Sequence, residues 1–252
     1  MLYGLYLSAS GVMAASHKQD VVANNIANVE TAGFKRDLAL FMERPTEAQA
    51  AGLGPSASHP MLERLGGGLL VAPTALDRTQ GELEPTDSPL DVAIFGDGYL
   101  TVRDAQGRTR LTRDGRMMID RGGNLVLPGG QPVLDDKGKP ITLDPTQVAT
   151  IADDGTVQQS GQPVARLGFA VVDRAVPLRK AGGNLLSVDD PAALRPATPN
   201  VRAGFLERSN VDPTLELTSL IETQRMLEFN AKMISYQDQT LGRLINEVGK
   251  IG

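Results

Sequence analysis

The sequence predicts an α+β fold in which long N- and C-terminal helices pair as a coiled coil. A mostly antiparallel β domain is inserted between the two helices in the sequence. A heptad pattern near the C-terminus and an amphipathic pattern near the N-terminus predict the two helices. Short apolar segments that alternate with turn residues predict the β domain. We expect a terminal helical domain (1–36 and 207–252), a linker or extended loop (37–68) and a β-rich outer domain (69–206).

The C-terminal helix carries apolar residues at a strict interval of seven. Asp212 is suited to cap this helix, Pro213 to its first position and Glu216 to its first turn. A long helix with such a stripe requires a partner to be stable in water. The repeated set is Leu220, Leu227, Ile234, Leu241 and Val248, and a companion set runs three positions ahead: Leu217, Gln224, Ala231, Asp238 and Ile245.

The N-terminal helix, from about Leu2 to Asn28, is the predicted partner. Gly33 follows it and can take the left-handed conformation that ends a helix. Small residues such as Gly11 allow another helix to approach closely. Its apolar side is formed by Leu5, Val12, Ala15, Val22 and Ile26.

The middle of the chain has the signals of strands and turns. Asp37–Met42 is expected as a short helical or extended piece, and Pro45–Gly68, rich in Gly, Pro, Ala and Ser, as a linker. Close spacing of strands favours antiparallel pairing. The strand segments predicted are Leu90–Phe95, Tyr99–Arg103, Arg108–Thr112, Arg116–Asp120, Asn124–Leu127 and Ala165–Val172.

The composition excludes several classes of function. The chain has 252 residues, 41% of them hydrophobic, a net charge of -5 and no Cys. The negative charge argues against nucleic-acid binding, and the lack of Cys excludes thiol chemistry. No apolar run is long enough to span a bilayer, so we expect no membrane insertion. No Lys or Arg precedes Lys18, so the first helix is expected to be retained and not cleaved as a secretory signal.

No residues are predicted to form a catalytic, metal or cofactor site. His17 and His59 lie in different segments, and the pairs Asp135-Asp136 and Asp153-Asp154 lack the ligand series of a calcium loop. Both acidic pairs are interpreted as turns. The serines have no placed His and Asp for nucleophilic chemistry.

Two terminal motifs carry a resemblance to a known family. The segment from Ala23 to Arg36, ANNIANVETAGFKR, resembles the N-terminal signature of bacterial flagellar rod and hook proteins. The segments LERSNVD, from Leu206, and IETQR, from Ile221, resemble the C-terminal signature. In the β region, DVAIFGDGY from Asp91 and TRDG from Thr112 look like the pattern of that family's β domain.

The resemblance implies a structural subunit of the flagellar basal-body rod, with the proximal subunit preferred over the distal one. Such a protein would be exported unfolded through the flagellar type III export apparatus, without cleavage. It would polymerise helically into the hollow axle that crosses the periplasm and transmits torque to the hook. The implied partners are further copies, other rod or hook axial subunits, the export apparatus and the surrounding ring proteins, with no cofactor.

The assembly residues are assigned from both the pattern and the resemblance. Asn24 and Asn28 share a helix face, so they are expected to fix the turn after the helix and to touch a neighbouring subunit. Capping within one chain is the alternative for these amides, and packing on an ordinary globular core is the alternative for the heptad stripe. The assigned residues are Leu5, Val12, Val22, Asn24, Asn25, Ile26, Asn28, Gly33, Phe34, Ser209, Asn210, Val211, Leu220, Gln224, Arg225, Leu227, Ile234, Leu241 and Val248.

Three other functions stay open at this point. A hook-type axial protein has the same terminal motifs, but a typical hook protein is much longer. A peptidoglycan-acting enzyme would need two carboxylates that converge in a cleft. A monomeric binding module would fold with fully protected termini, whereas an assembly subunit is expected to order its termini on polymerisation.

Overall fold

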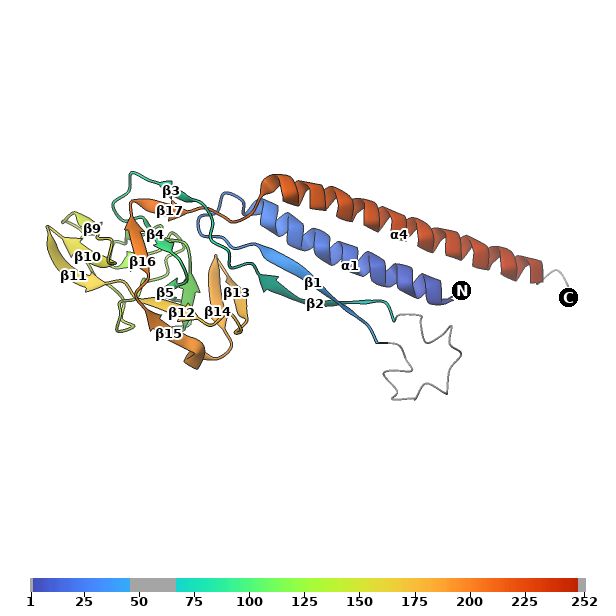
Figure 1. The fold of residues 1–252 in the computed structure, drawn as a ribbon, viewed down its shortest axis with the longest axis horizontal. Helices are drawn as coiled ribbons and strands as arrows, with labels where there is room; N and C mark the ends of the chain where they lie inside the picture. Colours follow the sequence, from blue (N-terminus) through green and yellow to red (C-terminus); the bar gives the residue numbers. More distant parts are fainter. Residues whose placement is uncertain (1, 46–66, 249–252) are drawn as a thin grey trace. The chain divides into compact units, whose positions relative to one another are not determined.

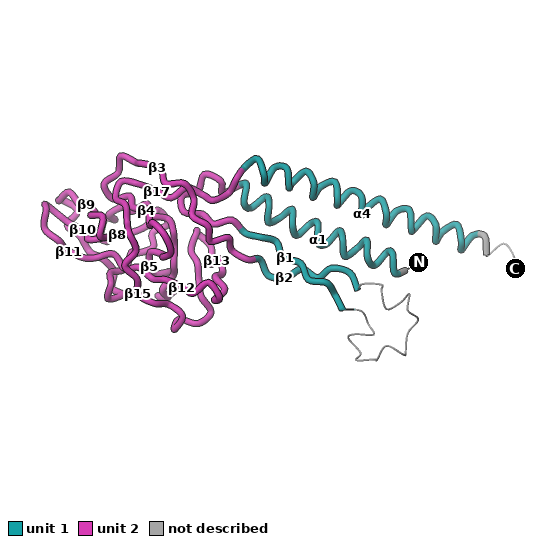
Figure 2. The backbone as a smooth tube through the Cα atoms, viewed as in Figure 1, with its two compact units in different colours: residues 1–26, 37–74, 213–252 teal, residues 27–36, 75–212 magenta. Residues whose placement is uncertain are grey.

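A computed structural model describes residues 2–45 and 67–248 of the chain (Figure 1). These residues form two compact units, shown in different colours in Figure 2. Unit 1 contains residues 1–26, 37–74 and 213–252, and unit 2 contains residues 27–36 and 75–212. The chain therefore passes between the two units four times.

Two long helices form most of unit 1. Helix α1 spans Leu2–Ala27 and helix α4 spans Pro213–Val248, which confirms the predicted helices. Beyond α1, the amide of Thr31 donates to the carbonyl of Asn28, and Gly33 has a φ of 66°. This left-handed residue is the predicted stop signal.

The two helices lie side by side and antiparallel (Figure 1). A Cβ added to Gly4 would lie 2.9 Å from Gln237 Nε2, and one added to Gly11 would lie 2.8 Å from Asn230 Oδ1. Glycine at these two positions therefore allows the helices to approach closely.

A β-hairpin completes unit 1. Strand β1 (Asp37–Glu43) pairs with β2 (Leu69–Leu76), so the segment expected as helical or extended is a strand. The hairpin lies along α1, where the ring of His17 meets Phe41 edge to face with 6.3 Å between the centroids. Residues 46–66, which include most of the predicted linker and His59, lie outside the described residues.

Unit 2 is a β domain whose strand pairs are antiparallel throughout the described ladders. Its largest sheet has the order β13-β14-β6-β5-β12-β15, and a second sheet has the order β11-β10-β9. Three further pairs are β16-β4, β17-β3 and β7-β8. The strands are β3 (Leu83–Pro85), β4 (Val92–Phe95), β5 (Tyr99–Arg103), β6 (Thr109–Thr112), β7 (Met118–Ile119), β8 (Leu125–Val126), β9 (Ala149–Ile151), β10 (Thr156–Gln159), β11 (Gln162–Arg166), β12 (Phe169–Val172), β13 (Leu178–Gly182), β14 (Leu185–Val188), β15 (Leu194–Ala197), β16 (Asn200–Ala203) and β17 (Phe205–Glu207), with one 3-10 turn at Pro191–Ala193.

One predicted strand was wrong. The segment Ala165–Val172 is not one strand, because β11 ends at Arg166 and β12 begins at Phe169 in a different sheet. Gly168 lies at the change of sheet, where a Cβ would come within 2.3 Å of the carbonyl oxygen of Asp135. This close backbone approach requires glycine and marks the break.

The core of unit 2 forms two clusters of buried apolar side chains. The larger cluster is centred on residues that are fully enclosed, such as Val102, Leu125, Val133 and Val157. The smaller cluster lies around Leu111 and Leu186. A closed apolar core of this kind gives unit 2 its own source of stability.

Candidate functional site

The face of α4 that meets α1 repeats at spacings of three and four residues. Asn230 and Gln237 are in contact with the glycines of α1, and residues three or four positions away on a helix share the same face. We call this set the inner stripe: Glu216, Leu220, Thr223, Leu227, Asn230, Ile234, Gln237 and Leu241. All of its members are buried or partly buried, and Thr223 is only 1% exposed.

The companion set predicted from the sequence does not belong to this face. Leu217 and Ile245 are 50% and 71% exposed, and Gln224, Ala231 and Asp238 are exposed as well. The residues that share the inner face with Leu220 and its repeats each lie one position before a residue of the predicted companion set. They are Glu216, Thr223, Asn230 and Gln237. The error arose because these inward positions are polar, so an apolar pattern does not reveal them.

A second stripe on α4 is apolar and open to solvent in the single chain. Leu215, Met226, Phe229 and Tyr236 are 61%, 52%, 63% and 62% exposed, and Met233 is partly buried. The spacing of these residues by combinations of three and four places them on one helix face. We call this set the outer stripe. Exposed apolar surface of this extent is typical of a binding surface.

The assigned residues of the helices differ in their exposure. Among those of α1, Val22 is buried, Leu5, Val12 and Ile26 are partly buried, and Asn24 is exposed. In α4, Leu220, Leu227, Ile234 and Leu241 are partly buried, and Gln224 and Arg225 are exposed. The side chain of Val248 lies outside the described residues.

Asn25 closes the end of α1 onto the strand that follows it. Its Nδ2 donates to the carbonyl oxygen of Asp37, and its Oδ1 accepts from the amide of Asp37, both at 2.9 Å. The side chain is 1% exposed, so both hydrogen bonds are shielded from water. This pair of bonds lies within one chain, as in the alternative interpretation of the asparagine motif. Asn28, the next asparagine of the motif, accepts from the hydroxyl of Thr31 at 3.2 Å.

Gly33 and Phe34 hold the start of unit 2 against its β strands. The amide of Gly33 donates to the carbonyl oxygen of Glu207 at 2.6 Å, and a Cβ at Gly33 would lie 2.2 Å from the carbonyl carbon of Arg113. Phe34 is buried, and Lys180 Nζ lies 3.6 Å from its ring centroid. The glycine is required both for its φ and for this close approach.

The same region contains a buried ion cluster formed by Lys35, Glu207 and Arg113. Glu207 Oε1 accepts from Lys35 Nζ at 2.5 Å, and Glu207 Oε2 accepts from Arg113 Nη1 at 3.0 Å. Lys35 also donates to the carbonyl of Thr79. The side chains of the three charged residues are 0–4% exposed. Burial lowers the pKa of Lys35, although the charge of Glu207 acts in the opposite direction.

Asn210 joins Arg36 to the segment from Asp77 to Thr79, beside this cluster. Its Oδ1 accepts from the amide of Arg36 at 2.8 Å, and its Nδ2 donates to the carbonyls of Asp77 and Thr79 at 3.1 Å. Ser209 Oγ accepts from the amide of Val211, whose side chain is buried. The two family-like motifs therefore meet in unit 2, where they form internal contacts.

The sequence did not predict the ion cluster. Lys35 and Glu207 belong to the quoted motifs, but they are separated by 172 residues, and Arg113 comes from a third segment. The available signal was a charged residue next to an apolar one in each motif, as in Phe34-Lys35 and Leu206-Glu207.

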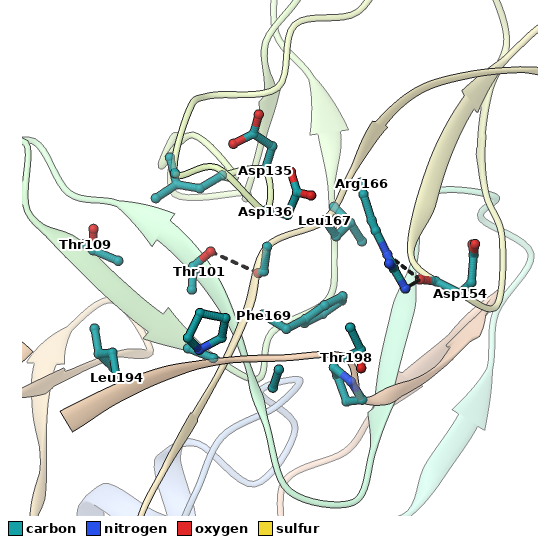
Figure 3. A pocket seen from close by; sticks show the side chains of 17 residues that line it. Thr101, Thr109, Asp135, Asp136, Asp154, Arg166, Leu167, Phe169, Leu194 and Thr198 are labelled. Carbon is teal, nitrogen blue, oxygen red and sulfur yellow. Dashed lines mark hydrogen bonds between the residues drawn. The ribbon is translucent and has the colours of Figure 1, made fainter. Parts of the chain in front are cut away.

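A cavity of about 360 Å³ lies in unit 2 between β5, β12 and β15 (Figure 3). Asp135, Asp136, Asp154 and Arg166 line it together with apolar residues such as Phe169. The carboxylates of Asp135 and Asp154 accept backbone amides of their own turns. The backbone hydrogen bond from Thr156 lowers the pKa of Asp154, the reverse of what a general acid requires. The acidic residues thus behave as the turn residues that the sequence predicted.

The described residues contain neither a cluster of metal ligands nor a membrane-spanning helix. Residues 2–45 and 67–248 contain no group of three or more His, Cys, Asp or Glu placed to hold a metal ion. Within the same ranges, neither helix combines the length and apolar character needed to cross a membrane.

Family models match three parts of the chain. Residues 5–35 match the flagella basal body rod protein model, residues 93–159 the flagellar hook protein FlgE/F/G D1 domain, and residues 202–247 the flagellar basal body rod FlgEFG protein C-terminal model. The two terminal matches contain the motifs that meet at Gly33 and Glu207.

Relatives align over nearly the whole chain. A protein named flagellar basal-body rod protein FlgF from Caulobacter vibrioides is 37% identical over 98% of both chains. Proteins named flagellar basal-body rod protein FlgG from Bacillus subtilis and from Buchnera aphidicola subsp. Acyrthosiphon pisum are each 34% identical. The alignments cover 98% and 97% of this chain, respectively, and 99% of each relative.

Proposed function

The chain belongs to the flagellar basal-body rod protein family, whose members are structural and not enzymes, and we propose that it polymerises helically through its two terminal helices. In this proposal α1 and α4 pair as a coiled coil and form the inner tube of a hollow axle across the periplasm. Unit 2 lies outside the tube, and the axle transmits torque to the hook.

The exposed outer stripe of α4 is the main observation that supports this proposal. Leu215, Met226, Phe229 and Tyr236 leave large apolar surfaces open along a helix of 36 residues. The helix already has one partner, α1, on its inner stripe. A helix with a second uncovered apolar stripe is expected to bind another helix. Neighbouring axial subunits, including further copies of this chain, are the proposed partners.

Replacing one residue of the outer stripe tests the proposal. Phe229→Asp should leave the single chain folded, because Phe229 is 63% exposed, but should reduce incorporation into basal bodies. Gln239→Asp is the matched control, because Gln239 is exposed on the same helix and outside both stripes. Immunoblots of purified basal bodies give the comparison, and equal incorporation of the two variants would contradict the proposal.

We also propose that the chain is exported unfolded by the flagellar type III apparatus and that its N-terminal segment carries the export information. This segment is part of the fold, since Ala15 and Val22 of α1 are buried. Cleavage after export would therefore remove packed residues. N-terminal sequencing of the chain recovered from basal bodies should find α1 intact, whereas a shortened N-terminus would contradict uncleaved export.

Within the rod we assign the chain to the proximal part, with the surrounding ring proteins as additional neighbours. Labelling unit 2 with a gold-binding tag and imaging isolated basal bodies tests this assignment. Label on the proximal part is expected, and label confined to the distal part would contradict it.

A further inference from the structure

Helix α4 buries the more polar of its two stripes. Half of the inner stripe is polar, namely Glu216, Thr223, Asn230 and Gln237. The outer stripe has large apolar residues and remains mostly open. Burial of apolar surface alone would favour the opposite arrangement, with Phe229 and Tyr236 against α1. A specific feature of the α1–α4 contact must therefore select the inner stripe.

The glycines of α1 provide this feature. Gly4 and Gly11 are seven residues apart, and so are Gln237 and Asn230 opposite them. The amide group of Asn230 lies against Gly11, with Oδ1, Cγ and Nδ2 all 2.8–3.0 Å from the position of an added Cβ. At each contact an amide side chain occupies the space that a side chain on α1 would need.

Hydrogen bonding holds one of these amides in place. Asn230 Nδ2 donates to the carbonyl oxygen of Met226, one turn earlier on α4, at 2.9 Å. This bond directs the amide plane, so Asn230 cannot move away from Gly11 without losing this solvent-exposed hydrogen bond. Gln237 Oε1 is buried and has no hydrogen-bond partner among the described residues. This oxygen therefore contributes to the packing against α1 but adds no hydrogen bond.

We propose that the Gly11–Asn230 and Gly4–Gln237 contacts select the face of α4 that meets α1 and thereby keep the outer stripe available for a second copy. The part that concerns the second copy rests on the proposed function. Turning α4 by about 100°, the angle between successive residues of a helix, would place Phe229 and Tyr236 opposite the two glycines. At these positions the amides of Asn230 and Gln237 already lie 2.8 and 2.9 Å from the position of a Cβ added to the glycine, so the larger rings of Phe229 and Tyr236 would require α1 and α4 to move apart. The two contacts thus favour one helix face over a more apolar competitor, as specificity elements do.

Disulfide trapping in the whole chain measures which face of α4 lies against α1. The natural chain has no Cys, so only the introduced pair can cross-link. The pair Gly4→Cys with Gln237→Cys reports the observed face, and Gly4→Cys with Tyr236→Cys reports the rotated one. Only the first pair is expected to cross-link efficiently, because a disulfide needs Cβ atoms about 4 Å apart.

The Gly11–Asn230 contact is then altered in chains that carry one or the other of the two Cys pairs. Gly11→Leu should lower the ratio of the first cross-link to the second about tenfold, as expected for residues in contact. Asn230→Ala, which vacates the space beside residue 11, should restore most of the ratio. Gly242→Leu is the matched control, because no atom lies within 4 Å of a Cβ at Gly242. The milder change Gly11→Ala gives the same comparison if Gly11→Leu prevents folding.

An unchanged ratio in both Gly11 variants, or no restoration by Asn230→Ala, would overturn the inference. Measuring the natural chain in purified basal bodies separates this result from the proposed function. Absence of the natural chain from basal bodies contradicts the proposed function alone, whereas a normal amount together with unchanged cross-linking contradicts the selection of the helix face alone.

Discussion

Glu207 is the residue on which three distant segments of unit 2 converge. Its carboxylate accepts from Lys35, from Arg113 and from the amide of Gly81 at 2.5, 3.0 and 2.9 Å. Its own backbone oxygen accepts from Gly33. Removing one partner from a buried ion pair leaves an uncompensated charge. The free energy lost in this way exceeds the stabilisation that the intact pair provides. Glu207 therefore determines whether the two terminal motifs stay together.

We predict that Glu207→Gln lowers the free energy of unfolding of unit 2 by about 3–5 kcal/mol, because Lys35 and Arg113 lose their buried counter-charge. Glu84→Gln is the control, since Glu84 pairs with Arg208 at 3.6 Å and its side chain is 60% exposed. That exposed pair should contribute less than about 1 kcal/mol. Urea unfolding of both variants checks the prediction, and losses of equal size would count against it.

Acid should weaken unit 2 through carboxylates of its turns. Desolvation raises the pKa of Asp104, but hydrogen bonds from Arg108, Arg110 and Gln106 outweigh it and lower the pKa to about 2, from a usual value of 3.8. The pKa values of Asp120, Asp144 and Asp154 are lowered as well. A carboxyl with a lowered pKa in the folded state stabilises the fold above its unfolded pKa and loses that contribution as the pH falls through the folded pKa.

We therefore expect the urea midpoint of unit 2 to be constant above the usual carboxyl pKa and to decrease as the pH falls from 3.8 to about 2. Asp104→Asn should reduce this decrease, because one of the carboxyls responsible is removed. A midpoint that stays constant down to the lowest pH, or that rises in acid, would show that these turns are not coupled to folding.

The ion cluster also shows the limit of inference from one sequence. The motifs around Lys35 and Glu207 could be recognised, and Gly33 could be assigned to a helix end from its local pattern. The pairing of Lys35 with Glu207, and of both with Arg113, depends on contacts between segments far apart in the chain. A periodicity carries no information about such contacts, so the buried charges were not predicted.

At the level of elements, the helices were more predictable than the strands. The limits of α1 and α4 follow from local signals, such as Asp212-Pro213 at one start and Gly33 beyond one end. The predicted strands from Tyr99 and Arg108 correspond to β5 and β6. The break at Gly168 was missed, because it depends on Asp135 from another segment, and β13–β17 have short patterns with no strong alternation.

We predict that Ile234→Asp disrupts assembly more than Arg243→Asp does. Ile234 belongs to the inner stripe and is partly buried, so a carboxylate placed there loses part of its hydration, whereas Arg243 is exposed on the same helix. Motility in soft agar and the amount of the chain in purified basal bodies give the two measurements. Similar losses for both variants would refute the assignment of Ile234 to the buried face.

At the level of the whole molecule, the chain contains a β unit with its own buried core and a helical unit with uncovered apolar surface. All of unit 2 lies within residues 27–212, and it has its own buried core. Unit 1 has large apolar residues exposed on α4 and also on the hairpin, where Leu40, Met42 and Leu69 are 44%, 54% and 48% exposed. This difference suits a protein that folds one part alone and completes the other on assembly.

A chain that ends after Leu227 separates the two parts. It keeps every residue of unit 2 but loses most of α4, so the β unit should remain folded while incorporation into basal bodies is abolished. Circular dichroism and methyl NMR signals of the β core measure the first effect, and immunoblots of basal bodies measure the second. Normal incorporation of the shortened chain would refute the role of α4.

We propose that α1 and α4 of each copy form the wall of a tube in which neighbouring subunits cover the outer stripe. An electron cryo-microscopy map of the purified basal body, at a resolution that shows side chains, tests it most directly. We expect Phe229 and Tyr236 to be buried against a neighbouring subunit and unit 2 to lie outside the tube. A map in which the outer stripe faces open solvent, or in which unit 2 forms the inner wall, would contradict the claim.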